Sequence, residues 1–105
     1  MFAEKSWGDY KVMDVESGSM TIKVTLNAGH SMNYHSHNNR DEVWVVISGE
    51  GRTIVDGMEQ KVKAGDVITM SAGCKHTVFA DTELKLIEVQ LGEAITAQDK
   101  VKYEL

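Results

Sequence analysis

Short stretches that alternate apolar and polar residues run through most of this chain. The clearest is 20–26, Met-Thr-Ile-Lys-Val-Thr-Leu, in which every second residue is apolar. Because successive side chains of a strand point to opposite faces, this period of two predicts a strand with one buried face. Strand-like runs of the same kind predict further strands at 7–15, 30–37, 42–48, 51–55, 58–62, 67–70, 77–80 and 84–91.

The breaks between these runs carry turn-forming residues. Asp56-Gly57 separates two strand-like runs by two residues, which is a strong signal for a tight hairpin. Many short strands at such spacing are typical of a sandwich or barrel. We therefore expect an all-β chain that forms one β-barrel domain over residues 1–105. Only the stretch 96–103 is expected to form a helical turn or two.

Composition and charge limit the class of protein, the partners and the cellular location that we expect. The chain has 105 residues, of which 42% are hydrophobic and 26% are charged, as in globular proteins. Its net charge of −5 argues against nucleic acid or anionic membrane as a partner, and against a phosphorylated substrate unless the site is locally basic. The longest apolar run, 43–47, is far too short to span a bilayer. A single cysteine, Cys74, and no export signal predict a cytoplasmic protein.

Four potential metal ligands recur at short spacings. His35 and His37 are two residues apart, so on a strand they point to the same face. Glu42 opens the next strand-like run, and His76 can complete the set from a distant hairpin. Imidazole nitrogen and carboxylate oxygen bind divalent metals at neutral pH. A lone His-x-His would be read as polar loop residues, but four ligands among regularly placed glycines predict a metal site.

Two motifs resemble the paired signatures of the cupin superfamily. The first is Gly29-x5-His35-x-His37-x4-Glu42-x6-Gly49, and the second is Gly65-x5-Ser71-x-Gly73-x2-His76-x3-Ala80. Ser71 and Ala80 stand where the family usually has proline and asparagine. The resemblance implies a double-stranded β-helix, or jelly-roll barrel, that binds one divalent metal through His35, His37, Glu42 and His76.

A narrower resemblance covers much of the remaining chain. The segments 7–10, 40–49 and 86–92 look like the opening, the Arg-x-Glu-x-Trp run and the C-terminal signature of type II mannose-6-phosphate isomerase cupins. The family's opening proline is replaced by Ser6, and the nucleotidyltransferase domain that often precedes this module is not in the sequence. This resemblance implies interconversion of mannose 6-phosphate and fructose 6-phosphate.

Four more side chains are candidates for the chemistry. Arg40 offers a planar, bidentate donor for a phosphate, although it can equally be a rim arginine paired with Asp41 or another acid. Trp44 shares strand parity with Glu42 and would wall the ligand pocket, or else belong to the core. Glu88 is a candidate proton carrier, because an acid within an apolar strand is uncommon unless it has a partner, or else it faces solvent or a dimer partner. Gln90, on the same face, would then hydrogen-bond the substrate.

The ligand set leaves coordination positions open for a substrate on a metal that prefers five or six ligands. Zinc is the first choice, with manganese, iron, nickel or cobalt as alternatives. The leading function is isomerisation of a sugar phosphate, with a metal-dependent dioxygenase or oxidase and a non-catalytic small-ligand-binding cupin as the other two. Exposed strand edges on so small a barrel must be covered, and pairing with a second copy of the chain is the simplest way to cover them. We therefore expect a homodimer.

Overall fold

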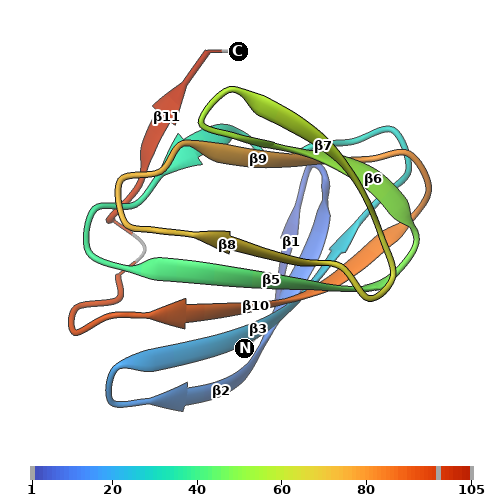
Figure 1. Ribbon diagram of the computed structural model, residues 1–105. Coiled ribbons are helices and arrows are strands. Elements are labelled where there is room, and N and C mark those ends of the chain that lie inside the picture. Colours follow the sequence, from blue (N-terminus) through green and yellow to red (C-terminus); the bar gives the residue numbers. More distant parts are fainter. Residues whose placement is uncertain (1, 97, 105) are drawn as a thin grey trace.

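The computed structural model describes residues 2–96 and 98–104, which form strands, turns and loops (Figure 1). No helix occurs in this described part of the chain, and hence none that is long and apolar enough to cross a membrane. The strands are β1 (Phe2–Lys5), β2 (Gly8–Glu16), β3 (Ser19–Leu26), β4 (Tyr34–Ser36), β5 (Asp41–Ser48), β6 (Glu50–Val55), β7 (Met58–Lys63), β8 (Val67–Met70), β9 (His76–Ala80), β10 (Leu84–Leu91) and β11 (Val101–Tyr103).

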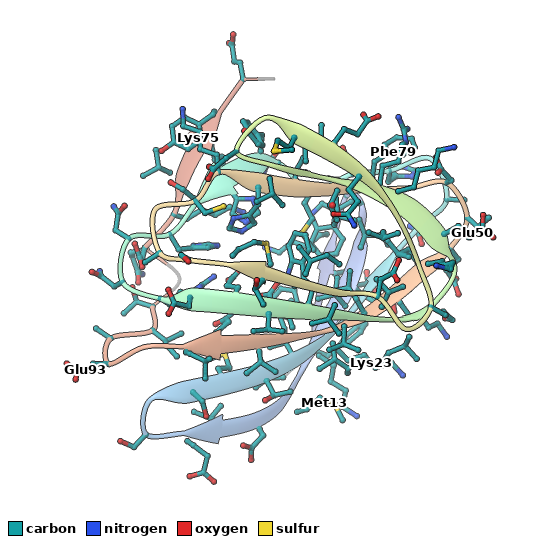
Figure 2. The ribbon with its side chains drawn as sticks, in the orientation of Figure 1. Met13, Lys23, Glu50, Lys75, Phe79 and Glu93 are labelled. Carbon is teal, nitrogen blue, oxygen red and sulfur yellow. The ribbon has the colours of Figure 1, made fainter. Side chains whose placement is uncertain are left out.

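Two antiparallel sheets pack face to face and enclose the core. One sheet has the order β1-β2-β3-β10-β5-β8, and the other has the order β11-β4-β9-β6-β7. Side chains from both sheets fill the space between them, while Met13 and Lys23 lie on the outer side of the larger sheet (Figure 2). The core is built from the following buried residues: Ile22, Val24, Leu26, Trp44, Val46, Val62, Ile68, Met70, Val78, Ala80, Leu84 and Leu86. The all-β prediction is confirmed.

Strands β5 and β10 lie side by side in the larger sheet; β10 alternates between buried and less buried residues throughout, and β5 does so from Asp41 to Ile47. On β5 the inward positions include Glu42 and Trp44. On β10 they include Glu88 and Gln90. The inner face of the barrel therefore receives polar side chains at one end of these two strands.

The hairpin predicted at Asp56-Gly57 joins β6 to β7. Val55 and Met58 are direct partners on the two strands, and the two residues between them have φ values of 47° and 82°. Positive φ at both central positions is the geometry of a type I′ turn, whose twist matches that of the flanking strands. Glycine is suited to the second position because it lacks a Cβ atom.

Three expectations about local structure are corrected. Strand β1 was not expected, since the predicted strands begin at Trp7. The stretch 30–37 forms a strand only at Tyr34–Ser36, with an isolated bridge from Ser31 to Phe79. The helical turns predicted over 96–103 are wrong for the described residues of that stretch, because Val101–Tyr103 pairs with β4 as strand β11; Ala97 lies outside the described residues. Pairing with a distant strand supplies backbone hydrogen bonds that outweigh a weak local preference.

Candidate functional site

Four side chains from separate parts of the chain meet inside the barrel. His35 comes from β4, Glu42 from β5 and His76 from β9, while His37 follows the end of β4. One ligand atom from each lies within 4.8 Å of all the others, and all four side chains are buried. His35 and His76 are direct cross-strand partners, which explains why residues 41 positions apart share one face. The structure thus brings together the whole predicted ligand set.

Backbone carbonyl groups fix the orientation of all three imidazole rings. Nδ1 of His35 lies 2.5 Å from the carbonyl oxygen of Asn33, and Nδ1 of His37 lies 2.5 Å from that of Asp99. Nδ1 of His76 lies 2.9 Å from the carbonyl oxygen of Cys74. A carbonyl oxygen only accepts, so each Nδ1 must carry the hydrogen. Each Nε2 then presents a lone pair, as metal-binding histidines do when the other ring nitrogen is held.

Two buried atoms in this cluster have no hydrogen-bond partner among the described residues. They are Oε1 of Glu42 and Nε2 of His76, and they lie 3.1 Å apart. Since the hydrogen of His76 is on Nδ1, this contact sets a nitrogen lone pair against a carboxylate oxygen. Buried polar atoms are normally satisfied, and a cation between these two would satisfy both. The four residues therefore fit a divalent metal and can hold one.

The protonation states also suit metal binding. Burial lowers the pKa of His35 to about 3, even though its hydrogen bond to the Asn33 carbonyl opposes the shift. Burial likewise lowers the pKa of His37, against the attraction of the Glu42 charge. For Glu42 burial acts in the opposite direction, but contacts with His76, His37 and Arg40 prevail and lower its pKa to about 2. At neutral pH His35 and His37 therefore offer neutral imidazoles and Glu42 offers a carboxylate, the forms that coordinate metals.

Arg40 contacts the ligand set directly. Its Nε donates a hydrogen bond of 2.8 Å to Oε2 of Glu42, and its Nη2 lies 3.0 Å from Nε2 of His37. Its side chain is only 10% exposed. The acid that pairs with Arg40 is therefore Glu42 and not the adjacent Asp41. This pairing engages Oε2 of Glu42 and leaves Oε1 of that carboxylate facing His76.

A cavity of about 460 Å³ opens beside the ligand cluster. His35 and His37 line it, together with Arg40, Glu88 and Gln90. Glu42 and His76 are not among its lining residues in the described structure and lie deeper in the barrel. A small molecule in this cavity would therefore meet the His35 and His37 side of the cluster.

Glu88 is held in the cavity wall by two neutral donors. Nε1 of Trp44 donates to its Oε1 at 2.7 Å, and Nε2 of Gln90 donates to its Oε2 at 2.6 Å. Burial and the charge of Glu42 raise the pKa of Glu88 to about 7, although both hydrogen bonds oppose the rise. A carboxyl group with a pKa near 7 can both take up and release a proton at neutral pH.

The structure places Trp44 behind the cavity and not on its wall. The side chain is fully buried, and its ring lies edge-on to His76 with centroids 5.4 Å apart. The Trp44 side chain points inward, as strand parity predicts, but neighbouring side chains cover it completely. Trp44 reaches the cavity only through the hydrogen bond it donates to Glu88.

One residue at the site was given no role from the sequence. The Asp99 carbonyl accepts the hydrogen bond from His37, and the Asp99 carboxylate accepts two more, from the backbone N–H groups of Asn38 and Asn39. Asp99 thereby fastens the C-terminal segment to the metal-ligand segment.

A family comparison agrees with this geometry. The sequence profile of the cupin domain matches residues 22–90, which include all four candidate ligands. The chain belongs to the cupin family. The resemblance seen in the two sequence motifs is thus confirmed.

Curated relatives of this cupin are much longer proteins. This cupin is 26% identical over 102 residues to the mannose-1-phosphate guanylyltransferase ManC of Salmonella typhimurium. The match covers 95% of this chain and 21% of the relative. This cupin is also 26% identical over 101 residues to the mannose-1-phosphate guanylyltransferase of Escherichia coli, covering 94% of this chain and 21% of that protein. The chain spans about a fifth of the length of these relatives.

Solved structures share the fold at low sequence identity. An uncharacterized protein with a double-stranded β-helix domain from Klebsiella pneumoniae superposes with a TM-score of 0.78 and 21% identity, over 90% of this cupin and 82% of that chain. KdgF from Halomonas superposes with a TM-score of 0.77 and 17% identity, over 82% and 79% of the two chains. Salicylate 1,2-dioxygenase from Pseudoaminobacter salicylatoxidans superposes with a TM-score of 0.73 and 18% identity, over 77% of this cupin and 24% of the enzyme. These likenesses concern the fold alone.

Proposed function

We propose that this cupin interconverts a phosphorylated aldose and ketose, with mannose 6-phosphate and fructose 6-phosphate as the first pair to test. The observation that carries the proposal is Glu88, a buried carboxyl group with a pKa near 7 in the wall of a cavity that the metal-ligand cluster also lines. Relatives named for mannose-1-phosphate support the sugar assignment.

In the proposed reaction Glu88 carries one proton between neighbouring carbons. In its ionised form it takes the proton from C2 of the open-chain aldose, and the electron pair of that C–H bond forms a C1=C2 double bond while the carbonyl oxygen gains a proton. Glu88 then returns its proton to C1, the C2 hydroxyl loses its proton, and the ketose results. The sum of the steps is an isomerisation, and no oxidant is consumed.

A divalent metal held by His35, His37, Glu42 and His76 would polarise the substrate oxygens as a Lewis acid. Zinc is our first choice among zinc, manganese, iron, nickel and cobalt, because nitrogen and oxygen ligands of this kind suit it. The residue that moves the proton is Glu88. Gln90 keeps the Glu88 carboxyl group in place through the 2.6 Å hydrogen bond.

Deuterium exchange tests the proposal directly. Zinc-loaded protein is incubated with mannose 6-phosphate in deuterated water without oxygen, and the products are followed by NMR. We expect fructose 6-phosphate with deuterium at C1, and a decrease in kcat of about 10²- to 10⁴-fold in Glu88→Gln, the usual contribution of a positioned base. The Glu88→Gln protein should retain its metal, since Glu88 is not a ligand.

Failure of turnover with each of the five metals would overturn the isomerase proposal. Oxygen uptake with another substrate would favour the dioxygenase or oxidase alternative, and binding of a sugar without turnover would favour the ligand-binding alternative. The homodimer, the cytoplasmic location and the single domain over residues 1–105 stay predictions. Light scattering of the purified protein tests the first of them.

A further inference from the structure

The cavity beside the ligand cluster is basic, although the whole chain carries a net charge of −5. Three lysines line it in addition to Arg40, namely Lys5, Lys100 and Lys102. Lys5 ends β1, whereas Lys100 and Lys102 belong to the C-terminal segment, so the two ends of the chain supply the charges. All three side chains are exposed, which places their ammonium groups at the open side of the cavity.

Strand register directs Lys102 toward the cavity. In the pairing of β11 with β4, Lys102 lies directly opposite His35. Opposed residues of antiparallel strands project on the same face of the sheet, and His35 projects into the barrel. Lys102 is therefore a neighbour of a candidate metal ligand on the cavity side.

Lys100 is fixed by the residue that precedes it. Asp99 accepts three hydrogen bonds from His37, Asn38 and Asn39, and this anchors the backbone next to Lys100 at the metal-ligand segment. Partial burial and the charges of Lys102 and Lys5 lower the pKa of Lys100, and the charge of Glu88 opposes this shift. The three positive charges are thus close enough to repel one another.

Within the described residues, no carboxylate forms an ion pair with any of these three lysines. The ion pairs found there involve Arg40, Arg52, Lys63 and Lys85 as cations, apart from the histidine contacts of the ligand cluster, and none involves the three cavity lysines. Arg40 is already neutralised by Glu42 at 2.8 Å. Glu88 is the one acidic residue among those that line the cavity in the described structure, so positive charge remains in excess and favours the binding of an anion there.

We propose that Lys5, Lys100 and Lys102 form a subsite for a phosphoryl group at the mouth of this cavity, and that Arg40 serves the metal ligands instead. The assignment of the phosphoryl group to the far end of the isomerase substrate rests on the proposed function. A dianion suits the subsite better than a carboxylate, because three cations act on it together. The subsite selects phosphorylated over unphosphorylated sugars.

Binding measurements without turnover test the subsite. Metal-free protein, prepared with a chelator, is titrated by calorimetry with fructose 6-phosphate, fructose, glucuronate and inorganic phosphate. Phosphate-bearing ligands should bind more tightly than fructose and glucuronate, and the difference should shrink as salt rises. Each of Lys5→Gln, Lys100→Gln and Lys102→Gln should weaken binding of fructose 6-phosphate about three- to tenfold, as for loss of one charge-assisted contact at an exposed site. The matched control is Lys61→Gln, an exposed lysine on β7 that does not line the cavity.

The outcomes separate this proposal from the isomerase proposal. Loss of phosphate binding in the three variants, with the Lys61→Gln protein unchanged, supports the subsite even if no isomerisation is found. Equal binding of glucuronate and fructose 6-phosphate would overturn the phosphoryl assignment. An active isomerase whose KM for mannose 6-phosphate is the same in all three variants would overturn the subsite and leave the isomerase proposal intact.

Discussion

The indole Nε1 of Trp44 donates a hydrogen bond of 2.7 Å to Oε1 of Glu88, and both side chains are buried. The two residues are direct partners on the neighbouring strands β5 and β10. Burial raises the pKa of Glu88 to about 7, and this hydrogen bond is one of the contacts that opposes the rise. The pair therefore links a core aromatic residue to the protonation state of the proposed base.

Replacement of Trp44 by Phe tests this link. The phenyl ring keeps most of the packing but cannot donate, so we expect the pKa of Glu88 to rise and the variant to lose about 1–3 kcal/mol of stability. The pKa is measured by NMR of the labelled Glu88 carboxyl carbon, and the stability by denaturant unfolding. In the control, Trp7→Phe, the pKa should not change, because the described structure has no hydrogen bond between Trp7 and Glu88. An unaltered pKa in Trp44→Phe would contradict the prediction.

The raised pKa of Glu88 makes the stability of the metal-free protein depend on pH. Below about pH 4.5 the carboxyl group is protonated in both the folded and the unfolded chain, whereas between about 4.5 and 7 only the folded chain keeps the proton. Stability from this group is therefore lost as the pH rises through that window. Glu88→Gln removes the effect, so its stability relative to wild type should increase by on the order of 3 kcal/mol from pH 4 to pH 8. Parallel unfolding curves at both pH values would disprove this linkage.

Removal of His76 should release the metal. His76→Ala deletes one of four ligands, and even loss of a residue that only supports a ligand costs about 10- to 100-fold in metal affinity. We expect a decrease beyond about 100-fold, measured by competition with a chromogenic chelator. The matched control is His30→Ala, since the His30 side chain is exposed, hydrogen-bonds the Ala28 carbonyl and is not part of the ligand cluster. Full metal occupancy in His76→Ala would exclude the second sequence motif from the site.

Acidification should release the metal only at a pH lower than the one expected from the pKa of a free histidine. A free histidine has a pKa of about 6.5, which by itself predicts weaker binding below about pH 6. Burial lowers the pKa of His35 to about 3, so this ligand stays neutral through that range, and burial also lowers the pKa of His37 below its ordinary value. Metal occupancy is followed from pH 7 to pH 4 by equilibrium dialysis. Protonation of the His35 ring near pH 6, seen by NMR, would contradict the prediction.

Arg40 is expected to affect the metal more than the phosphate. Lysine at this position cannot contact Glu42 and His37 together, so Arg40→Lys should weaken metal affinity about tenfold, as for a residue that orients a ligand. At saturating metal the KM for mannose 6-phosphate should change little. Tighter metal binding in the variant would show instead that Arg40 competes with the metal for His37. A large rise in KM at unchanged metal affinity would show that Arg40 binds the phosphoryl group of the substrate.

The ligand set and much of the strand pattern could be predicted from the sequence without knowledge of the fold. His35, His37, Glu42 and His76 could be selected because motif spacing and residue chemistry are local properties of the chain. The pairing of Glu42 with Trp44, and of Glu88 with Gln90, on common faces also follows from the period of two of a strand. The backbone geometry imposes that period whatever the surrounding structure.

Tertiary structure alone decided which face of β10 is the inner one. Both faces of this strand carry apolar residues, so the pattern does not show that Glu88 and Gln90 point inward while Ile87 and Val89 point outward. Pairing with β3 and β5 fixes the choice, because a shift of one residue in register would reverse every side chain.

Contacts between distant segments also decided the surroundings of the ligands. The C-terminal residues form β11 instead of a helix because β4 offers them backbone partners and Asp99 binds the loop after His37. This docking sets Lys100 and Lys102 at a cavity whose local charge is opposite to that of the chain. Net charge sums over the whole sequence, whereas the potential at a site depends on which charges the fold brings within a few ångströms of one another.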